Sequence, residues 1–123
     1  MLKTDGIPTW VTVFALIAFL MGCASGLAGV FSQGMEGINE SMSISWGGRS
    51  IGLGLAAGLA VYLKHPTAYI VAFIGGMGRD LGDLAGELSK QDPAKGIVLF
   101  LVVFLILETL GIIAAQKARS LPA

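Results

Sequence analysis

The chain has 123 residues, of which 54% are hydrophobic and 13% are charged, whereas a soluble domain has about 25% charged residues. Eight basic residues balance eight acidic ones, so the sequence predicts no attraction to nucleic acid. The single cysteine, Cys23, excludes a disulfide framework, and the sequence has no His/Cys cluster, no phosphate-binding glycine loop and no Ser/His/Asp arrangement. We therefore expect a membrane protein with neither metal nor cofactor.

The first and last long apolar segments fit a lipid bilayer, whose core of about 30 Å is crossed by about 20 apolar residues in a helix. Residues 10–30 carry no charge and begin with Trp10, a residue type that is typical of membrane interfaces. Residues 97–116 contain a single charged residue, Glu108. Both segments predict membrane-spanning helices, and the bulky side chains of the second predict that much of its surface faces lipid.

Two further helices are expected at residues 46–63 and 68–88, although their uninterrupted apolar runs are short for a membrane span. They cross the bilayer only when charged helical turns are included. The segment 46–63 then contains Arg49, and the segment 68–88 contains Arg79, Asp80, Asp83 and Glu87. Pro66 prevents one continuous helix, so the two form an antiparallel hairpin, and Pro93 marks the next connection. The alternative is a pair of re-entrant or interfacial segments.

These elements predict one all-α domain over residues 1–123, a polytopic membrane protein with a four transmembrane helix bundle. Between the first two helices, Phe31, Met35, Ile38 and Met42 recur at helical spacing and predict a short amphipathic segment at one membrane face. Four spans place both termini on the side that carries more Lys and Arg, which predicts a multi-pass protein with both termini in the cytoplasm. The margin of charge is small and leaves a dual topology open.

Residues 20–23, Leu-Met-Gly-Cys, resemble the cleavage site of a bacterial lipoprotein. Met21 directly before Gly22 fits that site poorly, and Asp5 lies beside Lys3 in the segment that would be the basic leader. We therefore expect Cys23 to be a small packing residue and not a lipidated N-terminus.

Eighteen glycines are about twice the usual number, and many recur four residues apart. Helices in a bilayer associate through close backbone approach, which small residues at this spacing permit. The glycine rows lie on three of the four expected helices: Gly22 and Gly26; Gly48, Gly52, Gly54 and Gly58; and Gly78, Gly82 and Gly86. They predict tight packing within the bundle, and a row that the bundle leaves uncovered is the expected seam of a homodimer or of a larger membrane complex.

The charged residues inside the third and fourth expected helices are the most informative. An ionisable group near the centre of a membrane helix costs about 2.5–3.5 kcal/mol, so these groups must meet one another or water. Arg79, Asp83 and Glu87 share one helical face, which predicts an Arg79–Asp83 ion pair, with Glu87 nearer the surface and solvated. Arg79, Asp80 and Glu108 fall near mid-bilayer, which predicts a polar pocket that opens outward between the second, third and fourth helices.

The composition of this pocket points to acid–base chemistry. Acidic groups outnumber basic ones, so at least one carboxyl lacks a cation, and burial favours the neutral, proton-donating form of a carboxyl. The expected catalytic residues are Arg79, Asp80, Asp83 and Glu108, and the expected ligand-binding residues are Glu40, Trp46, Arg49 and Gly78. The alternative is a buried salt-bridge network that only fixes the register of the helices.

Four short motifs carry a resemblance to a known family: GINES at residues 37–41, WGGRSIGLGLA at 46–56, GGMGRDLGDL at 75–84 and LE at 107–108. With them, the chain resembles a family of small bacterial four-helix integral membrane proteins known only as a domain of unknown function. The resemblance implies a four-helix architecture in the bacterial inner membrane and supplies no reaction. It places the family's polar pattern at Glu40, Gly48, Gly78, Arg79 and Glu108, and this chain departs from it at Asp80 and Asp83.

A small lipophilic ligand is the leading interpretation of the pocket. Apolar walls with a few convergent polar groups are typical of small-molecule sites, so we expect an isoprenoid-, sterol- or quinone-like molecule that is bound or acted on by acid–base chemistry. A proton-coupled carrier of small molecules is the second hypothesis; small multidrug-resistance transporters are similar in size, but they carry their key carboxylate in the first helix, where this chain has none. The third is a noncatalytic subunit of a membrane complex.

Overall fold

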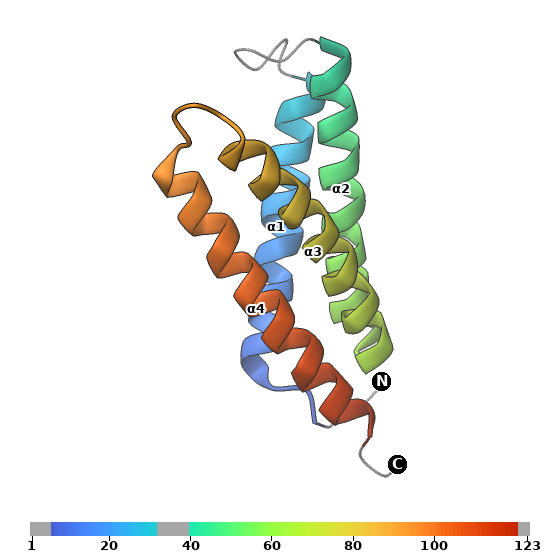
Figure 1. Ribbon diagram of the computed structural model, residues 1–123. Coiled ribbons are helices and arrows are strands. Elements are labelled where there is room, and N and C mark those ends of the chain that lie inside the picture. The colour runs from blue at the N-terminus through green and yellow to red at the C-terminus, as the bar shows by residue number, and fades with distance from the viewer. Residues whose placement is uncertain (1–5, 32–39, 121–123) are drawn as a thin grey trace.

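The structure, a computed structural model, describes the backbone of residues 6–31 and 40–120 and the side chains of the same residues apart from 40–45. Within these residues the chain forms four helices and no strand (Figure 1). The helices are α1 (Thr9–Phe31), α2 (Glu40–Leu63), α3 (Pro66–Leu88) and α4 (Lys95–Arg119). The predicted all-helical fold is confirmed, and each helix overlaps one predicted segment and extends beyond it.

Helix α2 begins well before its predicted start at Trp46. No Pro or Gly interrupts residues 40–46, and an acidic first residue, Glu40, is favoured at a helix N-terminus by the helix dipole. Residues 40–42 therefore belong to α2 and not to a separate amphipathic segment. The rest of that predicted segment, residues 32–39, lies outside the described residues.

The α2–α3 turn forms where Pro66 predicts it. Helix α2 ends at Leu63, Lys64 takes a positive φ of 56°, and Pro66 is the first residue of α3. His65 caps the new helix, because its Nδ1 accepts a hydrogen bond from the Thr67 N–H at 3.2 Å. Proline and the histidine cap together fix the hairpin of α2 and α3.

The α3–α4 turn is held by Glu87, which corrects the prediction that this side chain is solvated. Glu87 is only 8% exposed. One carboxylate oxygen accepts a hydrogen bond from the Ala94 N–H, and the other pairs with Lys90 Nζ, each at 2.9 Å. The N-cap residue of α4, Ala94, has no capping side chain of its own, so Glu87 ties the end of α3 to the start of α4.

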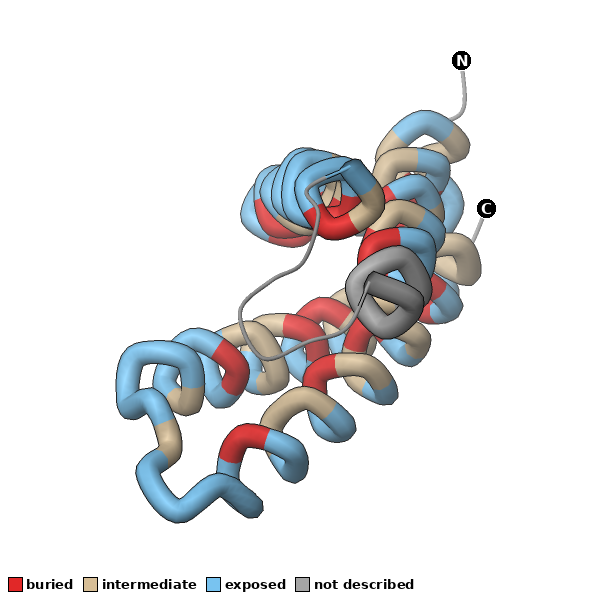
Figure 2. Tube along the Cα trace, turned by 90° about the horizontal axis from the view of Figure 1, so that it is seen from above, coloured by how far each residue is buried: buried red, intermediate tan, exposed pale blue. Residues whose placement is uncertain are grey.

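The helices form two antiparallel pairs, α1 with α2 and α3 with α4, and the most extensive contacts lie inside each pair. The backbones of the two pairs approach each other mainly through α2 and α3, whereas α1 and α4 lie farther apart and meet through side chains such as Phe14 and Phe104. In Figure 1 the lower end holds the start of α1, the α2–α3 turn and the end of α4. The upper end holds the end of α1, the start of α2 and the α3–α4 turn, and Figure 2, seen from above, shows the α3–α4 pair set apart from α1 there.

Glycines make the α1–α2 contact the closest in the bundle. A Cβ atom at Gly26 would lie 2.6 Å from the Gly47 carbonyl oxygen, and one at Gly22 would lie 2.9 Å from both the Ser50 carbonyl oxygen and Gly54 Cα. Real Cβ atoms do not approach backbone this closely, so only glycine allows the two helices to meet at this distance. The predicted packing is confirmed for Gly22, Gly26 and Gly54.

Gly58 also packs, against the Phe19 ring, but the remaining glycines of the predicted rows have no close neighbour among the described residues, which corrects that part of the prediction. A Cβ atom would meet nothing within 4 Å at Gly48, Gly52, Gly78, Gly82 or Gly86. On α3 the buried face is instead the one that carries Tyr69, Phe73 and Asp80. The uncovered rows stay the predicted seam for a second copy or a membrane partner.

An apolar core closes the lower half of the bundle. Its buried residues are Val11, Phe14, Ala15, Ala60, Tyr69, Ile70, Ala72, Phe73 and Ala115. The Phe14 ring lies 5.5 Å from Phe73 and 5.2 Å from Phe104, measured between ring centroids. The Tyr69 hydroxyl is 3.3 Å from Thr12 Oγ1, which gives the buried phenol a partner. The lower half is therefore packed mainly with apolar side chains, and the buried charged groups, Asp80, Glu87 and Glu108, lie above this core.

Two of the four described helices, α1 and α4, are long and apolar enough to cross a membrane. The mean hydropathy of their most apolar 18 residues is 2.2 and 2.9, respectively. Helices α2 and α3 do not meet the same measure, because α2 is rich in Ser and Gly and α3 carries four charged residues. The structure thus gives two candidate spans where four were predicted. Between residues 97 and 113 of α4, the exposed large side chains are apolar: Ile97, Leu99, Phe100, Val102, Val103, Ile106, Leu110 and Ile113.

Candidate functional site

A cavity of about 220 Å³ lies in the upper half of the bundle, where the weak α1–α4 contact leaves room for it. All four helices line this upper cavity, so α1 adds a wall that the prediction did not include. The lining residues are Ala18, Met21, Gly22, Ser25, Trp46, Ser50, Arg79, Asp80, Asp83, Phe100, Leu101 and Phe104. Below it, a cavity of about 20 Å³ reaches Glu108 and shares the wall residues Ala18, Arg79 and Phe104.

The buried ion pair of the site joins Arg79 to its neighbour Asp80. Arg79 donates from Nε and from Nη2 to the same oxygen, Asp80 Oδ1, at 3.2 and 3.1 Å. The Asp80 side chain is 2% exposed and the Arg79 side chain 20%. Such a buried carboxylate gains more from a nearby cation than an exposed one, because the dielectric around it is lower.

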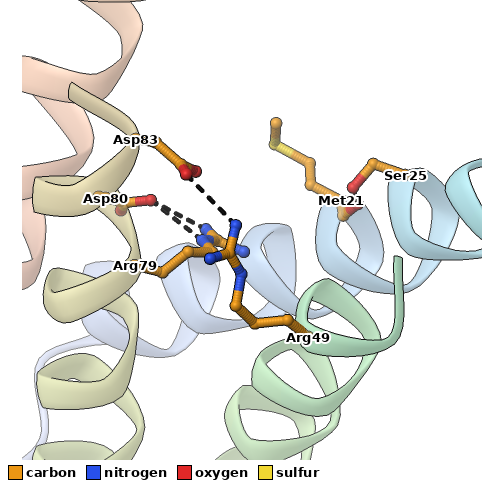
Figure 3. Close-up of polar contacts among 6 residues, drawn as sticks. All are labelled: Met21, Ser25, Arg49, Arg79, Asp80 and Asp83. Atoms are coloured by element: carbon orange, nitrogen blue, oxygen red, sulfur yellow. Dashed lines mark hydrogen bonds and ion pairs between the residues drawn. The ribbon is translucent and has the colours of Figure 1, made fainter. Parts of the chain in front are cut away.

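Asp83 is paired with a different residue, Arg49 of α2, whose Nη2 lies 3.3 Å from Asp83 Oδ1 (Figure 3). Both side chains of this second pair are partly open to solvent. The predicted Arg79–Asp83 pair is therefore wrong. Sequence spacing favoured it, but Arg79 turns to the more deeply buried carboxylate, Asp80, and Asp83 lies within reach of α2.

Glu108 of α4 is buried next to the Arg79–Asp80 pair. It is 4% exposed, and the charged groups that act on its carboxyl are Asp80 and Arg79. Gly76 of α3 makes room for it, because a Cβ atom there would collide with the Glu108 carboxylate. Two carboxylate oxygens, Asp80 Oδ2 and Glu108 Oε1, are buried without a hydrogen-bond partner in the described part of the chain. The two carboxyl groups lie within hydrogen-bond reach of each other, so a proton held by one of them supplies the donor that the other lacks.

The structure brings only some of the predicted ligand-binding residues to the upper cavity. Trp46 lines the upper cavity, and Arg49 joins the site through Asp83. Gly78 lies on the exposed side of α3 and lines neither of the two cavities. Glu40 is the first residue of α2, and its side chain lies outside the described part.

Sequence reasoning missed the polar contribution of α2 at Ser50. This serine is 1% exposed and lines the upper cavity. Its position held a usable signal, because it stands four residues after Trp46 and four before Gly54, on the same helical face. Ser25 of α1 also lines the cavity, but its hydroxyl donates to the Met21 carbonyl at 2.6 Å within its own helix (Figure 3).

The missed residues also give the cavity an aromatic lining. Phe100 and Phe104 of α4 stack with ring centroids 4.5 Å apart, and Trp46 of α2 lines the same space. The sequence predicts that the bulky side chains of the fourth helix face lipid; Phe100 is 43% exposed and also lines the cavity. The site therefore combines buried charges with apolar and aromatic walls. Among the described residues, no three His, Cys, Asp or Glu side chains are grouped so that they could hold a metal ion.

Comparisons with protein-family models, with curated proteins and with solved structures find no match for this chain. The resemblance to a bacterial four-helix membrane family therefore stays a prediction. The functional conclusion must come from the geometry of the site.

Proposed function

We propose that the protein is a small multi-pass membrane protein that binds a small lipophilic molecule in the upper cavity, or acts on it by acid–base chemistry. The observation that carries the proposal is a cluster of three carboxyl and two guanidinium groups at and just below a cavity whose other walls are mostly apolar. Arg79, Asp80 and Asp83 line the cavity, Arg49 joins it through its ion pair with Asp83, and Glu108 lies in the smaller cavity below. A few convergent polar groups in an apolar pocket are typical of small-molecule sites.

The membrane part of the proposal is that all four helices cross the bilayer. Helices α1 and α4 support it by length and composition. Helices α2 and α3 are continuous over 24 and 23 residues, or about 35 Å, which suffices for a hydrocarbon core of about 30 Å. Their most costly groups are hidden from lipid, since Asp80 faces the inside of the bundle with Glu108 of α4.

We place the lower end of the bundle in the bacterial cytoplasm. The described basic residues at that end are Lys64, Lys117 and Arg119, and Lys and Arg favour the cytoplasmic side. The upper cavity then opens toward the outer face of the inner membrane. The uncovered glycine rows of α2 and α3 are the proposed contact with a second copy or with a larger membrane complex.

The size of the cavity suggests how a ligand is held. A volume of about 220 Å³ is below the range of about 300–1,000 Å³ that is usual for small-molecule sites. We therefore expect the polar end of an isoprenoid-, sterol- or quinone-like molecule to enter the cavity, while its apolar remainder lies between α1 and α4 toward the lipid.

The arrangement of the carboxyl groups suits proton transfer. Asp80 and Glu108 interact directly, so a proton carried by one of them can be shared with the other and passed to a polar group of the ligand. Arg79 stabilises the carboxylate that remains, because it already bonds Asp80 Oδ1 twice. A lipophile bound without reaction needs the same groups only as hydrogen-bond partners.

Native mass spectrometry of the protein after gentle extraction tests this function. We expect a co-purified lipophile with the wild-type chain, and its loss in Asp80→Asn and in Arg79→Gln. Asp92→Asn makes the same chemical change at an exposed residue of the α3–α4 turn and is the matched control, which should keep the lipophile. Protein that is folded but free of lipophile in every preparation would contradict the proposal and favour a salt-bridge network that only sets helix register.

A further inference from the structure

The polar atoms that a ligand in the upper cavity can touch are mainly hydrogen-bond donors. The unpartnered carboxylate oxygens of Asp80 and Glu108 are out of its reach, because both atoms are fully enclosed by protein. Arg79 differs from them, since its side chain is 20% exposed and lines both cavities. Within the described residues its hydrogen bonds come from Nε and Nη2, so the N–H groups of Nη1 are available to a ligand.

Trp46 places a second donor in the same wall. It lines the upper cavity, and an indole N–H donates a hydrogen bond but cannot accept one. The most exposed carboxylate of the wall is Asp83, and one of its oxygens is already paired with Arg49. A ligand that satisfies Arg79 and Trp46 together must therefore bring acceptor oxygens.

The charge of the site favours a neutral acceptor. Asp80 and Glu108 share a hydrogen bond and hence a proton, so together they carry one negative charge, which Arg79 balances. Arg49 and Asp83 balance each other. An ammonium or a carboxylate group would add an uncompensated charge to an interior of low dielectric, whereas a carbonyl oxygen adds none.

The aromatic walls favour a flat headgroup. Phe100 and Phe104 of α4 stack on each other, and Trp46 of α2 lines the same space. Aromatic side chains pack well against a flat conjugated ring, in offset-stacked or edge-to-face arrangements. A cavity of about 220 Å³ has room for one such ring but not for a long tail, which must lie outside it.

We infer that the ligand of the upper cavity is a quinone-like lipophile, with a flat, neutral, carbonyl-bearing ring at its polar end. A carbonyl oxygen accepts from Nη1 of Arg79, the ring lies among Trp46, Phe100 and Phe104, and the tail leaves between α1 and α4. This inference rests on the proposed function and narrows its ligand class. Isoprenols and sterols are set apart from it, because their polar end is a hydroxyl group.

Decyl-p-benzoquinone tests the inference with the full chain in nanodiscs of neutral phosphatidylcholine. The quinone ring quenches tryptophan fluorescence on contact, so the quencher is the part of the probe that enters the cavity. The chain has two tryptophans, and Trp10→Phe leaves Trp46, which lines the cavity, as the only fluorophore of this type. We expect saturable quenching of Trp46, above the linear quenching by probe that is dissolved in the bilayer.

Three competitors separate the carbonyl from the ring and tail. p-Decylcyclohexanone, p-decylcyclohexanol and decylcyclohexane differ only at the polar end. We expect the ketone to relieve the saturable quenching at roughly tenfold lower concentration than the hydrocarbon, because it accepts a hydrogen bond from a charged donor. Relief by the alcohol at the same concentration as by the ketone would assign the site to hydroxyl-bearing lipophiles and overturn the inference.

A double variant tests the role of Arg79. Arg79→Met/Asp80→Asn removes the donor together with its paired charge, and the site stays neutral with the proton on Glu108. In the Trp10→Phe background we expect it to weaken binding of the quinone roughly tenfold. Arg119→Met/Asp92→Asn makes the same changes at exposed residues that do not line the cavity, so it should bind like the parent protein.

Unchanged saturable quenching in the folded cavity variant overturns the inference. Where that variant is not recovered as folded protein, the competitor series on the parent protein decides. A co-purified lipophile without saturable quenching by the quinone overturns the inference and leaves the lipophile-binding function standing. Absence of both the lipophile and the saturable quenching overturns both, and saturable quenching that depends on Arg79 supports both.

Discussion

At the scale of single residues, the two arginine–aspartate ion pairs have similar N–O distances, but we expect them to contribute very differently to the free energy of unfolding. The Arg79–Asp80 pair is nearly removed from solvent, with Asp80 only 2% exposed, whereas the Arg49–Asp83 side chains are 50% and 34% exposed. An exposed ion pair contributes about 0–1 kcal/mol, since water and salt screen it. Removal of one partner from a buried pair leaves an uncompensated charge and costs far more.

This contrast predicts the stability of two arginine variants. Arg79→Gln should lower the free energy of unfolding by about 3–5 kcal/mol because it leaves Asp80 buried without its cation. Arg49→Gln, the matched control, should cost about 1 kcal/mol or less. Thermal and chaotrope-induced unfolding of the purified variants in detergent measures both.

The double variant Arg79→Gln/Asp80→Asn checks the cause. If the penalty comes from an orphaned charge, neutralising Asp80 should restore much of the lost stability. Equal losses in Arg79→Gln and Arg49→Gln, or no recovery in the double variant, would show that the burial of the Arg79–Asp80 pair has been misjudged.

At the scale of helices, adjacent glycines of α2 have opposite surroundings. A Cβ atom at Gly47 would lie 2.5 Å from the Gly26 carbonyl oxygen and 2.8 Å from the Val30 backbone nitrogen, whereas one at Gly48 would meet nothing within 4 Å. The backbone of α1 cannot move away from Gly47 without opening the whole α1–α2 contact. Alanine at position 47 therefore tests the packing of α2 against α1, whereas alanine at position 48 tests only helix propensity.

We expect Gly47→Ala to lower the free energy of unfolding by about 1–3 kcal/mol through overpacking. In the detergent-dispersed monomer, where the proposed contact with a second copy is absent, Gly48→Ala should raise it by about 0.5–1 kcal/mol, because alanine is the better helix former and no described residue of the chain opposes it. The same unfolding measurements in detergent compare the two variants. A Gly48→Ala protein that is destabilised as strongly as Gly47→Ala would mean that a second copy or a partner covers this face.

Local signals in the sequence were sufficient to predict four helices and the two described turns, but not the start of α2, which lies six residues before its predicted position. Pro66 and Pro93 mark the two described connections, and the four apolar segments become the four helices. Side-chain partners were less predictable. Helical spacing identifies possible partners within one helix, but it does not show whether a residue from a neighbouring helix lies closer. Asp83 is paired by Arg49 across the α2–α3 contact, and Glu87 is drawn into a turn by the Ala94 N–H.

At the scale of the whole molecule, the bundle is divided into an apolar lower half and a polar upper half. The sequence predicts the gathering of Arg79, Asp80 and Glu108 because each is too costly to expose in a lipid environment. Trp46 was predicted as a ligand-binding residue, but the α1 wall and the phenylalanines of α4 were not predicted, since they depend on how the α3–α4 pair leans against the α1–α2 pair. Glycines of α1 and α2 meet backbone atoms across their seam, whereas Gly76 and Gly111 on the α3–α4 seam meet the side chains of Glu108 and Phe73.

An experimental density map of the protein, isolated with its native lipids, tests the central claim most directly. We expect Asp80 and Glu108 to face one another inside the bundle, with elongated density that enters the upper cavity from between α1 and α4 and ends beside Asp80. A map that places Glu108 on the lipid-facing surface, or that shows the cavity filled by side chains, would contradict a ligand site at this place.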